Sequence, residues 1–375
     1  MAHAMTRRTD FNPYVHGARG LFAALVFVFH VANSGLPTFA PWRTGPLFDA
    51  TMSLQFGVEL FFGISGFVIV GALGRAPSIR AFLWDRATRI YPVLWVSLVA
   101  ITLAAALAGR WRPPLGQWLL NFAAPPPFIH VGQINPAAWS LGYELTFYAL
   151  AAFVWWLRPR APSAWRPAAY VIGAIMVVLF PRAILIPAGI FIALGLGQRA
   201  SWWRWSAVPE LWLVLFLALW GGIALSEGEI QTLNPLDLPV ERWSVLPVML
   251  LAGLCGTLAL AGIAGGRGLI APILASPPMR WLGTVSYSFY LWHPVVMAVV
   301  KAAMLKAGAP ALLGSWSQTV FGLASLPGAL IVASLSQRWL EFGLTRWLRR
   351  HGPREDHGRA PITVRTGPNH TEPRP

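Results

Sequence analysis

Charged residues are scarce in this sequence: Asp, Glu, Lys and Arg make up only 11% of its 375 residues. Soluble domains average about 25% charged residues, so this composition excludes a soluble protein. Hydrophobic residues make up 56% instead, and apolar stretches about 20 residues long, enough for a helix to cross a bilayer, recur along the chain. An alternation with a period of two residues, which a transmembrane β-barrel would need, is missing. The sequence therefore predicts an all-α integral membrane protein.

Cysteine is almost absent as well. Cys255 is the single cysteine, which excludes internal disulfides, and its apolar, Gly-rich surroundings predict an inert packing residue. The sequence also lacks a metal-ligand cluster, a Walker loop and a Gly-rich dinucleotide turn, so we predict no metal site. The first hydrophobic stretch has no small-residue cleavage site, and we therefore expect no removable signal peptide.

About ten transmembrane helices are expected, and an even number puts both termini on one side of the membrane. Of the 29 Lys and Arg residues, 22 fall on the side of the termini and seven on the other. The positive-inside rule then predicts that both termini are cytoplasmic. This asymmetry accounts for the net charge of +15, so we predict no nucleic-acid partner. The expected spans are roughly 17–34, 53–73, 93–109, 137–157, 167–181, 184–198, 208–225, 245–264, 282–303 and 317–338.

Residues 1–344 are predicted to form one polytopic membrane domain. Within it, about 78–91 has the pattern of a short amphipathic helix on the inner interface, ending before Pro92. The arginines of this helix fit two roles equally well, an anchor to anionic lipid or a binding site for a polyanionic ligand. Residues 345–375 contain mainly Pro, Gly and charged residues, which predicts a disordered cytoplasmic tail.

Four ionisable side chains lie well inside expected spans, away from the span ends: His30, Glu59, Glu144 and His293. Such groups are costly in lipid unless they are paired or hydrated, so they mark functional cavities by default. A rise of 1.5 Å per residue places each of them about 16–24 Å from the cytoplasmic edge. We therefore expect them to meet in one polar chamber.

Two of these residues have simpler explanations as well. His293 precedes Pro294, and its ring would then bond a carbonyl that the proline leaves free. Glu59 would form a structural salt bridge with a neighbour. Arg19 favours the functional interpretation, because it lies on the same helix face as His30, three turns and about 16 Å closer to the cytoplasm.

Five stretches in this order resemble the membrane-bound acyltransferase 3 family, the integral-membrane O-acyltransferases that modify bacterial surface glycans. The first is Arg19 followed by ten residues and His30. The others are Gly57–Phe67 (GVELFFGISGF), Arg86–Trp95 (RATRIYPVLW), Trp139–Tyr148 (WSLGYELTFY) and Leu282–Pro294 (LGTVSYSFYLWHP). Many members have aspartate where Glu59 stands.

The resemblance implies a ten-helix core in the bacterial cell (inner) membrane that moves an acyl group from cytoplasmic acyl-CoA to a hydroxyl. Acetyl-CoA is the expected co-substrate, and no permanently bound cofactor is expected. The expected partners are acyl-CoA, membrane lipid and a glycan or lipid-linked saccharide acceptor. Arg19 and His30 match the arginine–histidine pair of the family, and Arg86 and Arg89 match its arginine pair at the inner face.

The chemistry of acyl transfer suggests roles for these residues. His30 suits the general base that takes the hydroxyl proton, and Glu144 would fix its tautomer. Arginine forks bind phosphate well, so Arg19, Arg80, Arg86 and Arg89 are candidates to bind the phosphates of coenzyme A. Tyr143, Tyr287, Tyr290 and Ser65 are the candidates to donate hydrogen bonds to the oxyanion. The residues expected to line the substrate chamber are Glu59, Ser65, Tyr143, Tyr148, Tyr287, Tyr290 and His293.

Other functions also fit mid-membrane ionisable residues. A proton-coupled secondary transporter or exporter would use them as a relay, although the sequence lacks the internal repeats and paired broken helices typical of transporters. A non-catalytic assembly partner is a third interpretation, and a small hydroxylated molecule is an alternative acceptor. Direct transfer and transfer through an acyl-enzyme both fit the residues.

Overall fold

The computed structural model describes residues 11–107, 113–198, 200–227 and 245–351, and every regular element in these ranges is helical. Six helices among them are long and apolar enough to cross a bilayer. They span Pro13–Ala32, Pro46–Arg75, Ile79–Ala106, Leu246–Ala264, Pro277–Lys306 and Ala309–Arg350. These helices confirm the all-α class and support a multi-pass membrane protein.

The other four expected spans also coincide with helices, although these do not meet the same criterion. The fourth span corresponds to α7 (Trp139–Arg160), and three shorter apolar helices, Trp165–Leu179, Pro181–Ala193 and Pro209–Ile223, match the next three. They include α8 (Trp165–Leu179), α9 (Leu185–Ala193) and the start of α10 (Pro209–Glu227). The number of ten crossings stays a prediction.

The sixth expected span, 184–198, is wrong in its length. Helix α9 has nine residues and is therefore only about 14 Å long, about half of the hydrocarbon thickness. Gly195 and Gly197 follow it with φ of +69° and +73°, in the left-handed region that favours glycine and ends a helix.

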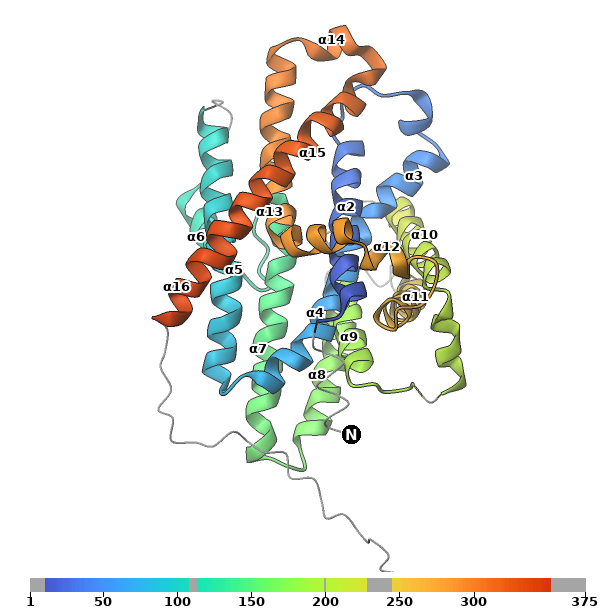
Figure 1. Cartoon of the computed structure of the whole chain (residues 1–375), viewed down its shortest axis with the longest axis vertical. Helices are drawn as coiled ribbons and strands as arrows, with labels where there is room; N and C mark the ends of the chain where they lie inside the picture. Colours follow the sequence, from blue (N-terminus) through green and yellow to red (C-terminus); the bar gives the residue numbers. More distant parts are fainter. Residues whose placement is uncertain (1–10, 108–112, 199, 228–244, 352–375) are drawn as a thin grey trace, which may run out of the picture.

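Helix α2 (Pro13–Ala32) carries Arg19 and His30 and packs along α13 (Pro277–Lys306), beside α4 (Gly57–Arg75) and α12 (Ala271–Ala275) (Figure 1). It begins after Asn12, whose side chain accepts hydrogen bonds from the backbone N–H groups of Tyr14 and Val15. Gly17 allows the close approach of α12, because a Cβ there would lie 1.9 Å from the carbonyl oxygen of Leu274.

Helix α4 (Gly57–Arg75) continues from α3 (Pro46–Ser53) and the 3₁₀ turn η2 (Leu54–Phe56). Its small residues form a groove below Glu59 in which α9 packs: a Cβ at Gly66 would lie 2.0 Å from the carbonyl oxygen of Ile186, in the first turn of α9. Such close backbone contact through small residues is typical of helix pairs in membranes.

Helix α5 (Ile79–Leu107) is continuous through Pro92, so the expected helix end before that proline is wrong. Proline has no N–H and leaves the carbonyl of Thr88, four residues earlier, without its helical donor. The hydroxyl of Thr345, in α16 (Thr345–Arg350), donates to this carbonyl at 2.7 Å and replaces the missing bond. The amphipathic stretch and the third span are therefore one element, and its place at the membrane interface stays a prediction.

The last part of the described chain forms a long oblique rod (Figure 1). It comprises α15 (Ser317–Ser336), the π-helix η9 (Gln337–Leu344) and α16, and it contacts α13 and α5. Helix α16 covers the first six residues of the expected tail, and the domain boundary after residue 344 stays a prediction. The rest of the expected tail, 352–375, lies outside the described residues.

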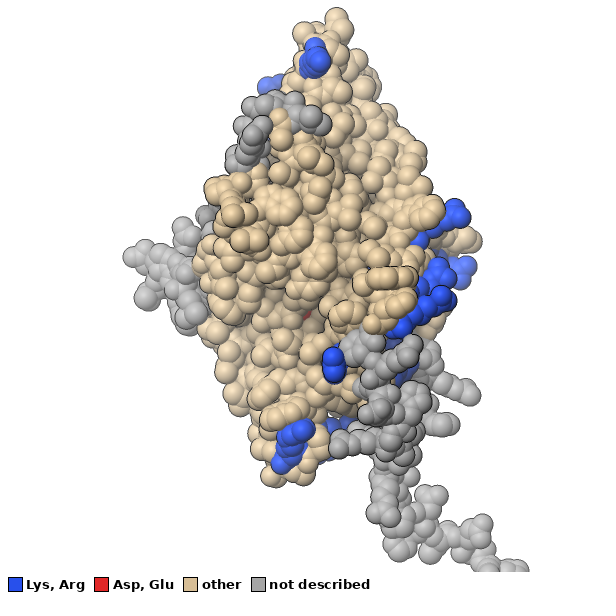
Figure 2. All heavy atoms as spheres, turned by 90° about the vertical axis from the view of Figure 1, so that its left-hand side faces the viewer, with Lys and Arg blue, Asp and Glu red and all other residues tan. Residues whose placement is uncertain are grey.

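The surface fits a lipid environment. Large apolar side chains such as Leu103, Val214, Leu323 and Ile331 are more than half exposed along the helices. The face in Figure 2 is almost free of acidic groups, and its Lys and Arg side chains gather toward the ends and one edge. An apolar belt between charged ends is the pattern expected of a protein immersed in a bilayer.

Candidate functional site

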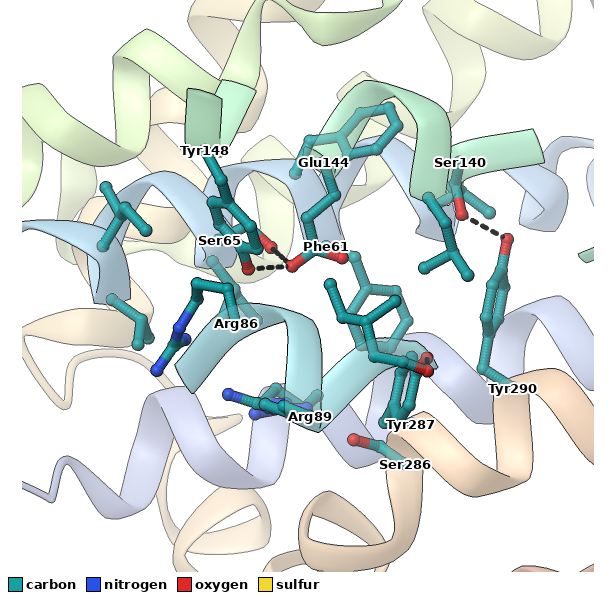
Figure 3. Close-up of a pocket in the computed structure, with 18 residues that line it drawn as sticks. Phe61, Ser65, Arg86, Arg89, Ser140, Glu144, Tyr148, Ser286, Tyr287 and Tyr290 are labelled. Carbon is teal, nitrogen blue, oxygen red and sulfur yellow. Dashed lines mark hydrogen bonds between the residues drawn. The ribbon is translucent and has the colours of Figure 1, made fainter. Parts of the chain in front are cut away.

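A cavity of about 80 Å³ lies among α2, α4, α5, α7 and α13 (Figure 3). This volume has room for several water molecules or a small acyl group. Eight predicted site residues line it, alongside apolar side chains such as Phe61 and Ile69. The eight are Arg19, Ser65, Arg86, Arg89, Glu144, Tyr148, Tyr287 and Tyr290.

Three arginines give this cavity a positive charge. Helix α5 contributes Arg86 and Arg89, one turn apart, and α2 contributes Arg19, whereas Glu144 is the one carboxylate among the lining residues. The guanidinium of Arg86 lies 5.8 Å from the centre of the Tyr148 ring. A cavity with three cations and one anion attracts negatively charged ligands.

An ion-pair arrangement outside the cavity holds Arg86 in place. Arg86 donates to the carboxylate of Asp85, its neighbour on α5. The other oxygen of Asp85 lies 2.5 Å from Nη2 of Arg349 on α16. The C-terminal rod therefore neutralises Asp85 in part and leaves the arginines as the dominant charges on the cavity wall.

Glu144 is held by two hydroxyl groups (Figure 3). Ser65 on α4 donates its hydroxyl to Oε1 of Glu144 at 3.0 Å, and Tyr148, one turn further along α7, donates to the same oxygen. Among the described residues no hydrogen bond joins Glu144 to His30. The expected pairing of these two residues is therefore not formed.

Tyrosines form the end of the cavity that lies across Figure 3 from Arg86. The hydroxyls of Tyr290 and Ser140 are 3.0 Å apart and share a hydrogen bond. Tyr287 donates its hydroxyl to the carbonyl of Ile90 at 2.8 Å. The ring of Tyr290 lies 6.1 Å from the ring of His293, so this end of the cavity is next to that histidine.

The two intramembrane histidines contact each other beyond this end. Nδ1 of His30 lies 2.8 Å from the carbonyl oxygen of Val26 and 3.3 Å from Nε2 of His293. Nδ1 of His293 lies 3.0 Å from the carbonyl oxygen of Phe289, and the ring also interacts with the backbone of Tyr290, whose carbonyl Pro294 leaves without its helical donor. His293 is fully buried and His30 is partly buried.

Glu59 forms a separate buried ion pair. Its Oε1 lies 2.6 Å from Nε and 2.5 Å from Nη2 of Arg182, whose guanidinium stacks 4.2 Å from the Trp139 ring. The two side chains are 1% and 3% exposed. Arg182 is thus a buried partner, not the outer-loop charge that the span assignment implied, and Glu59 has the structural salt bridge offered as its alternative.

Five predicted site residues therefore lie off the cavity wall. The expectation of one chamber for all four intramembrane ionisable groups is wrong, because His30 and His293 form one cluster, Glu59 and Arg182 a second, and the cavity around Glu144 a third. Arg80 is exposed on α5, and the Tyr143 ring packs against Phe62 at 5.4 Å.

Glu341 is near the site but was not predicted from the sequence. It lies in the π-helix η9, accepts a hydrogen bond from the hydroxyl of Ser288 at 2.6 Å and interacts electrostatically with Arg19 and Tyr287. π-Helical turns are often found at functional sites. The available signal was a single acidic residue just beyond the tenth span; that position alone predicts a cytoplasmic surface residue.

Known proteins resemble this chain over most of its length. A family model described as an acyltransferase domain matches residues 12–336. The exopolysaccharide production protein ExoZ of Rhizobium meliloti (strain 1021) is 31% identical over 294 residues, which cover 72% of this chain and 86% of ExoZ. Acyltransferase MdmB of Streptomyces mycarofaciens is 27% identical over 376 residues, 91% of this chain and 93% of MdmB.

A more distant relative is the peptidoglycan O-acetyltransferase OatA of Listeria monocytogenes serovar 1/2a (strain ATCC BAA-679 / EGD-e). It is 23% identical over 390 residues, which cover 90% of this chain and 57% of OatA. No solved structure matches the chain.

The matched range includes each helix that lines the cavity, from α2 to α13. An enzyme that transfers acyl groups accounts for the cavity and the histidine pair better than the transporter or the assembly partner does. The chain is an acyltransferase of the acyltransferase 3 family.

Proposed function

We propose that this enzyme moves an acetyl group from acyl-CoA on the cytoplasmic side of the bacterial inner membrane to a hydroxyl of a glycan or glycolipid. One observation carries the proposal: three arginines line the cavity, and its Tyr290 end, across from Arg86 (Figure 3), is next to the His30–His293 pair. The names of ExoZ and OatA, which refer to an exopolysaccharide and to peptidoglycan O-acetylation, support a glycan acceptor and an acetyl group.

The arginines of the cavity suit acyl-CoA as the acyl donor. Coenzyme A carries several phosphate groups, and arginine binds phosphate through paired N–H donors. Arg19, Arg86 and Arg89 face one cavity, and the charge asymmetry of the sequence favours a cytoplasmic position for this end. The pantetheine arm would then follow the cavity toward Tyr290.

The histidines suit the chemistry. His30 takes the proton of the acceptor hydroxyl as the oxygen attacks the thioester carbonyl. The carbon–sulfur bond breaks, the new ester forms, and the thiolate of coenzyme A receives the proton from His30. Tyr290, whose hydroxyl is bonded to Ser140 at the cavity end, is a candidate donor to the oxyanion.

The proposal is tested with the full-length protein in lipid nanodiscs, radiolabelled acetyl-CoA and a panel of acceptors. The panel contains de-O-acetylated exopolysaccharide, de-O-acetylated peptidoglycan fragments and a macrolide. We expect label to enter a glycan. Transfer to the macrolide alone would replace the glycan with a small hydroxylated acceptor, and transfer to none of the three would contradict the proposal.

Two variants separate the roles of the histidine and the arginines. His30→Ala should lower acetyl transfer by at least about 100-fold, the contribution typical of a general base, without weakening acetyl-CoA binding. Arg89→Ala should weaken acetyl-CoA binding by about tenfold, the loss of one charge-assisted hydrogen bond. Arg166→Ala is the matched control, because Arg166 is exposed and stacks on Trp165 away from the cavity. Full transfer by His30→Ala would eliminate His30 as the base.

A further inference from the structure

The His30–His293 contact specifies where the protons of both rings lie. A carbonyl oxygen only accepts hydrogen bonds, so the ring nitrogen beside it must carry the hydrogen. Nδ1 of His30 lies beside the carbonyl of Val26, and Nδ1 of His293 lies beside the carbonyl of Phe289. In their neutral forms both rings are therefore protonated on Nδ1 and have a lone pair on Nε2.

This assignment makes the contact between the two rings a directed hydrogen bond. Nε2 of His293, as an acceptor, lies 3.3 Å from Nδ1 of His30, which carries a hydrogen. That hydrogen is shared between the carbonyl of Val26 at 2.8 Å and the ring of His293. The Nε2 of His30 keeps its lone pair, and among the described residues it has no hydrogen-bond partner.

The surroundings of His293 keep its ring in this orientation. The side chain is fully buried on α13, and its ring stacks on Phe289 at 5.7 Å with an angle of 23° between the planes. Phe27 of α2 contacts it edge-on at 6.2 Å. A ring packed between two aromatic side chains and bonded to its own helix is held in one rotamer, as an orienting group requires.

We propose that His293 is the positioning residue for His30, in the place that a carboxylate takes in a catalytic triad. This inference rests on the proposed function, in which His30 is the base. Nε2 of His30 takes the acceptor proton, and the resulting imidazolium donates its Nδ1–H to the neutral Nε2 of His293 and to Val26. His293 touches neither the acyl donor nor the cavity wall, and it acts through His30 alone.

If His293 orients His30, Glu144 is not needed for that purpose and is free to serve on the cavity wall. Its Oε1 already accepts from Ser65 and Tyr148, and it lies on the cavity wall with the arginines. A neutral acceptor for His30 also fits the surroundings better than a second carboxylate would, because an anion buried on α13 would need a cation of its own.

Three variants of His293 test the proposal in nanodiscs, with acetyl-CoA and the acceptor that the wild type uses best. His293→Gln keeps an oxygen acceptor at about the reach of Nε2, whereas His293→Met and His293→Phe remove the acceptor. We expect the apolar variants to lower kcat at least about tenfold, part of the contribution of a general base. The KM for acetyl-CoA should not change, and His293→Gln should recover most of the lost rate.

A matched control and a measurement on the wild type separate positioning from folding. Gln318→Ala removes a 2.8 Å hydrogen bond to Ala32, near the same end of α2, without touching His30, and should keep the wild-type kcat. In the wild type, diethyl pyrocarbonate should modify His30 at its free Nε2 and spare His293, with the exposed His351 as the reference site. This measurement needs no variant to fold.

The outcomes distinguish the two proposals. If the wild type transfers acetyl and His30→Ala does not, but folded His293→Met and His293→Phe keep the wild-type kcat, the positioning role is wrong and the base survives. If His293→Gln is as slow as the apolar variants, the acceptor is not what His293 contributes. Modification of His293 as fast as that of His30 would also overturn the inference. If the wild type transfers acetyl to none of the acceptors, the proposed function itself is contradicted.

Discussion

Two carboxylates that the sequence places at similar depth have very different partners. Glu59 faces a guanidinium and is almost completely buried, whereas Glu144 faces two hydroxyls on a cavity wall. A buried charge that is paired with a fixed cation is neutralised in place and stabilises the fold only while both partners are present. A carboxylate held by hydroxyls beside arginines can respond to a ligand. The first pair therefore suits structure, and the second arrangement suits the site.

The Glu59–Arg182 pair gives the residue-scale prediction. Arg182→Met leaves the carboxylate of Glu59 buried without a cation, so the free energy of unfolding should fall by about 3–5 kcal/mol. The double variant with Glu59→Leu removes both charges and should recover most of this loss. Thermal unfolding of purified protein in detergent measures both effects.

The matched control for this prediction is Arg160→Met. Arg160 stacks 4.4 Å from the Trp156 ring on an exposed part of α7, so its loss should cost at most about 1 kcal/mol. Equal destabilisation in the single Arg182 variant and in the double variant would mean that the aromatic stacking of Arg182 on Trp139, and not the ion pair, stabilises this region.

Sequence spacing predicted the depth of these residues but not their contacts. The rise per residue puts His30, Glu59, Glu144 and His293 at similar levels, and it says nothing about how each helix is rotated against its neighbours. The partner of Glu59 comes from the short segment before α9, which the span assignment left as an outer turn. The eight residues on the cavity wall were predictable because their motifs repeat the pattern of a known family.

Helix α5 shows how an element depends on another one far away in the sequence. Pro92 interrupts its hydrogen bonds, and Thr345 repairs the interruption across 257 positions of the chain. Local rules therefore predicted a helix end at Pro92, and they failed because the repair comes from tertiary structure. The same contact, together with Arg349 and Asp85, attaches the C-terminal rod to the helix that carries Arg86 and Arg89.

A double-variant cycle tests this repair. Thr345→Val leaves the carbonyl of Thr88 unsatisfied and buried, so the free energy of unfolding should fall by about 1–3 kcal/mol. Pro92→Ala restores the backbone N–H that bonds this carbonyl within α5. In the Pro92→Ala background, Thr345→Val should therefore cost much less. Thermal unfolding in detergent gives the coupling energy between the two sites.

The size of the coupling decides the outcome. A cost of Thr345→Val that is the same in both backgrounds means that the hydroxyl stabilises α16 in some other way and that the continuity of α5 does not depend on it. A strong coupling would mean that the C-terminal rod helps to form the proposed acyl-CoA site. The rod would then determine the shape of α5, the helix that presents two of the three cavity arginines.

At the scale of the whole molecule, the orientation in the membrane decides whether the cavity arginines can reach acyl-CoA, the proposed acyl donor. Sequence charge alone predicts cytoplasmic termini, because 22 of the 29 basic residues fall on their side. The structure modifies this count slightly, since Arg182 is buried and no longer counts as an outer charge. The helical class and the membrane location were predictable from composition, whereas the short α9 depends on two left-handed glycines.

Thiol labelling tests the orientation directly. Cys255, the single native cysteine, is 2% exposed, so the wild type should react poorly with a membrane-impermeant maleimide. Thr44→Cys, on the exposed segment between α2 and α4, should react in intact spheroplasts. Ser163→Cys, on the exposed turn between α7 and α8, should react only after the membrane is permeabilised, because three expected spans separate the two positions.

The labelling result determines whether a cytoplasmic thioester can reach the cavity. Acyl-CoA does not cross the membrane unaided, since its phosphates are charged. The predicted pattern puts the inner ends of α2, α5 and α7 in the cytoplasm, together with the arginines that face the cavity. A reversed pattern would turn that end outward and rule out a cytoplasmic donor. Labelling of both positions from outside would mean that α4, α5 and α7 make an even number of crossings, and the ten-span topology would then be wrong.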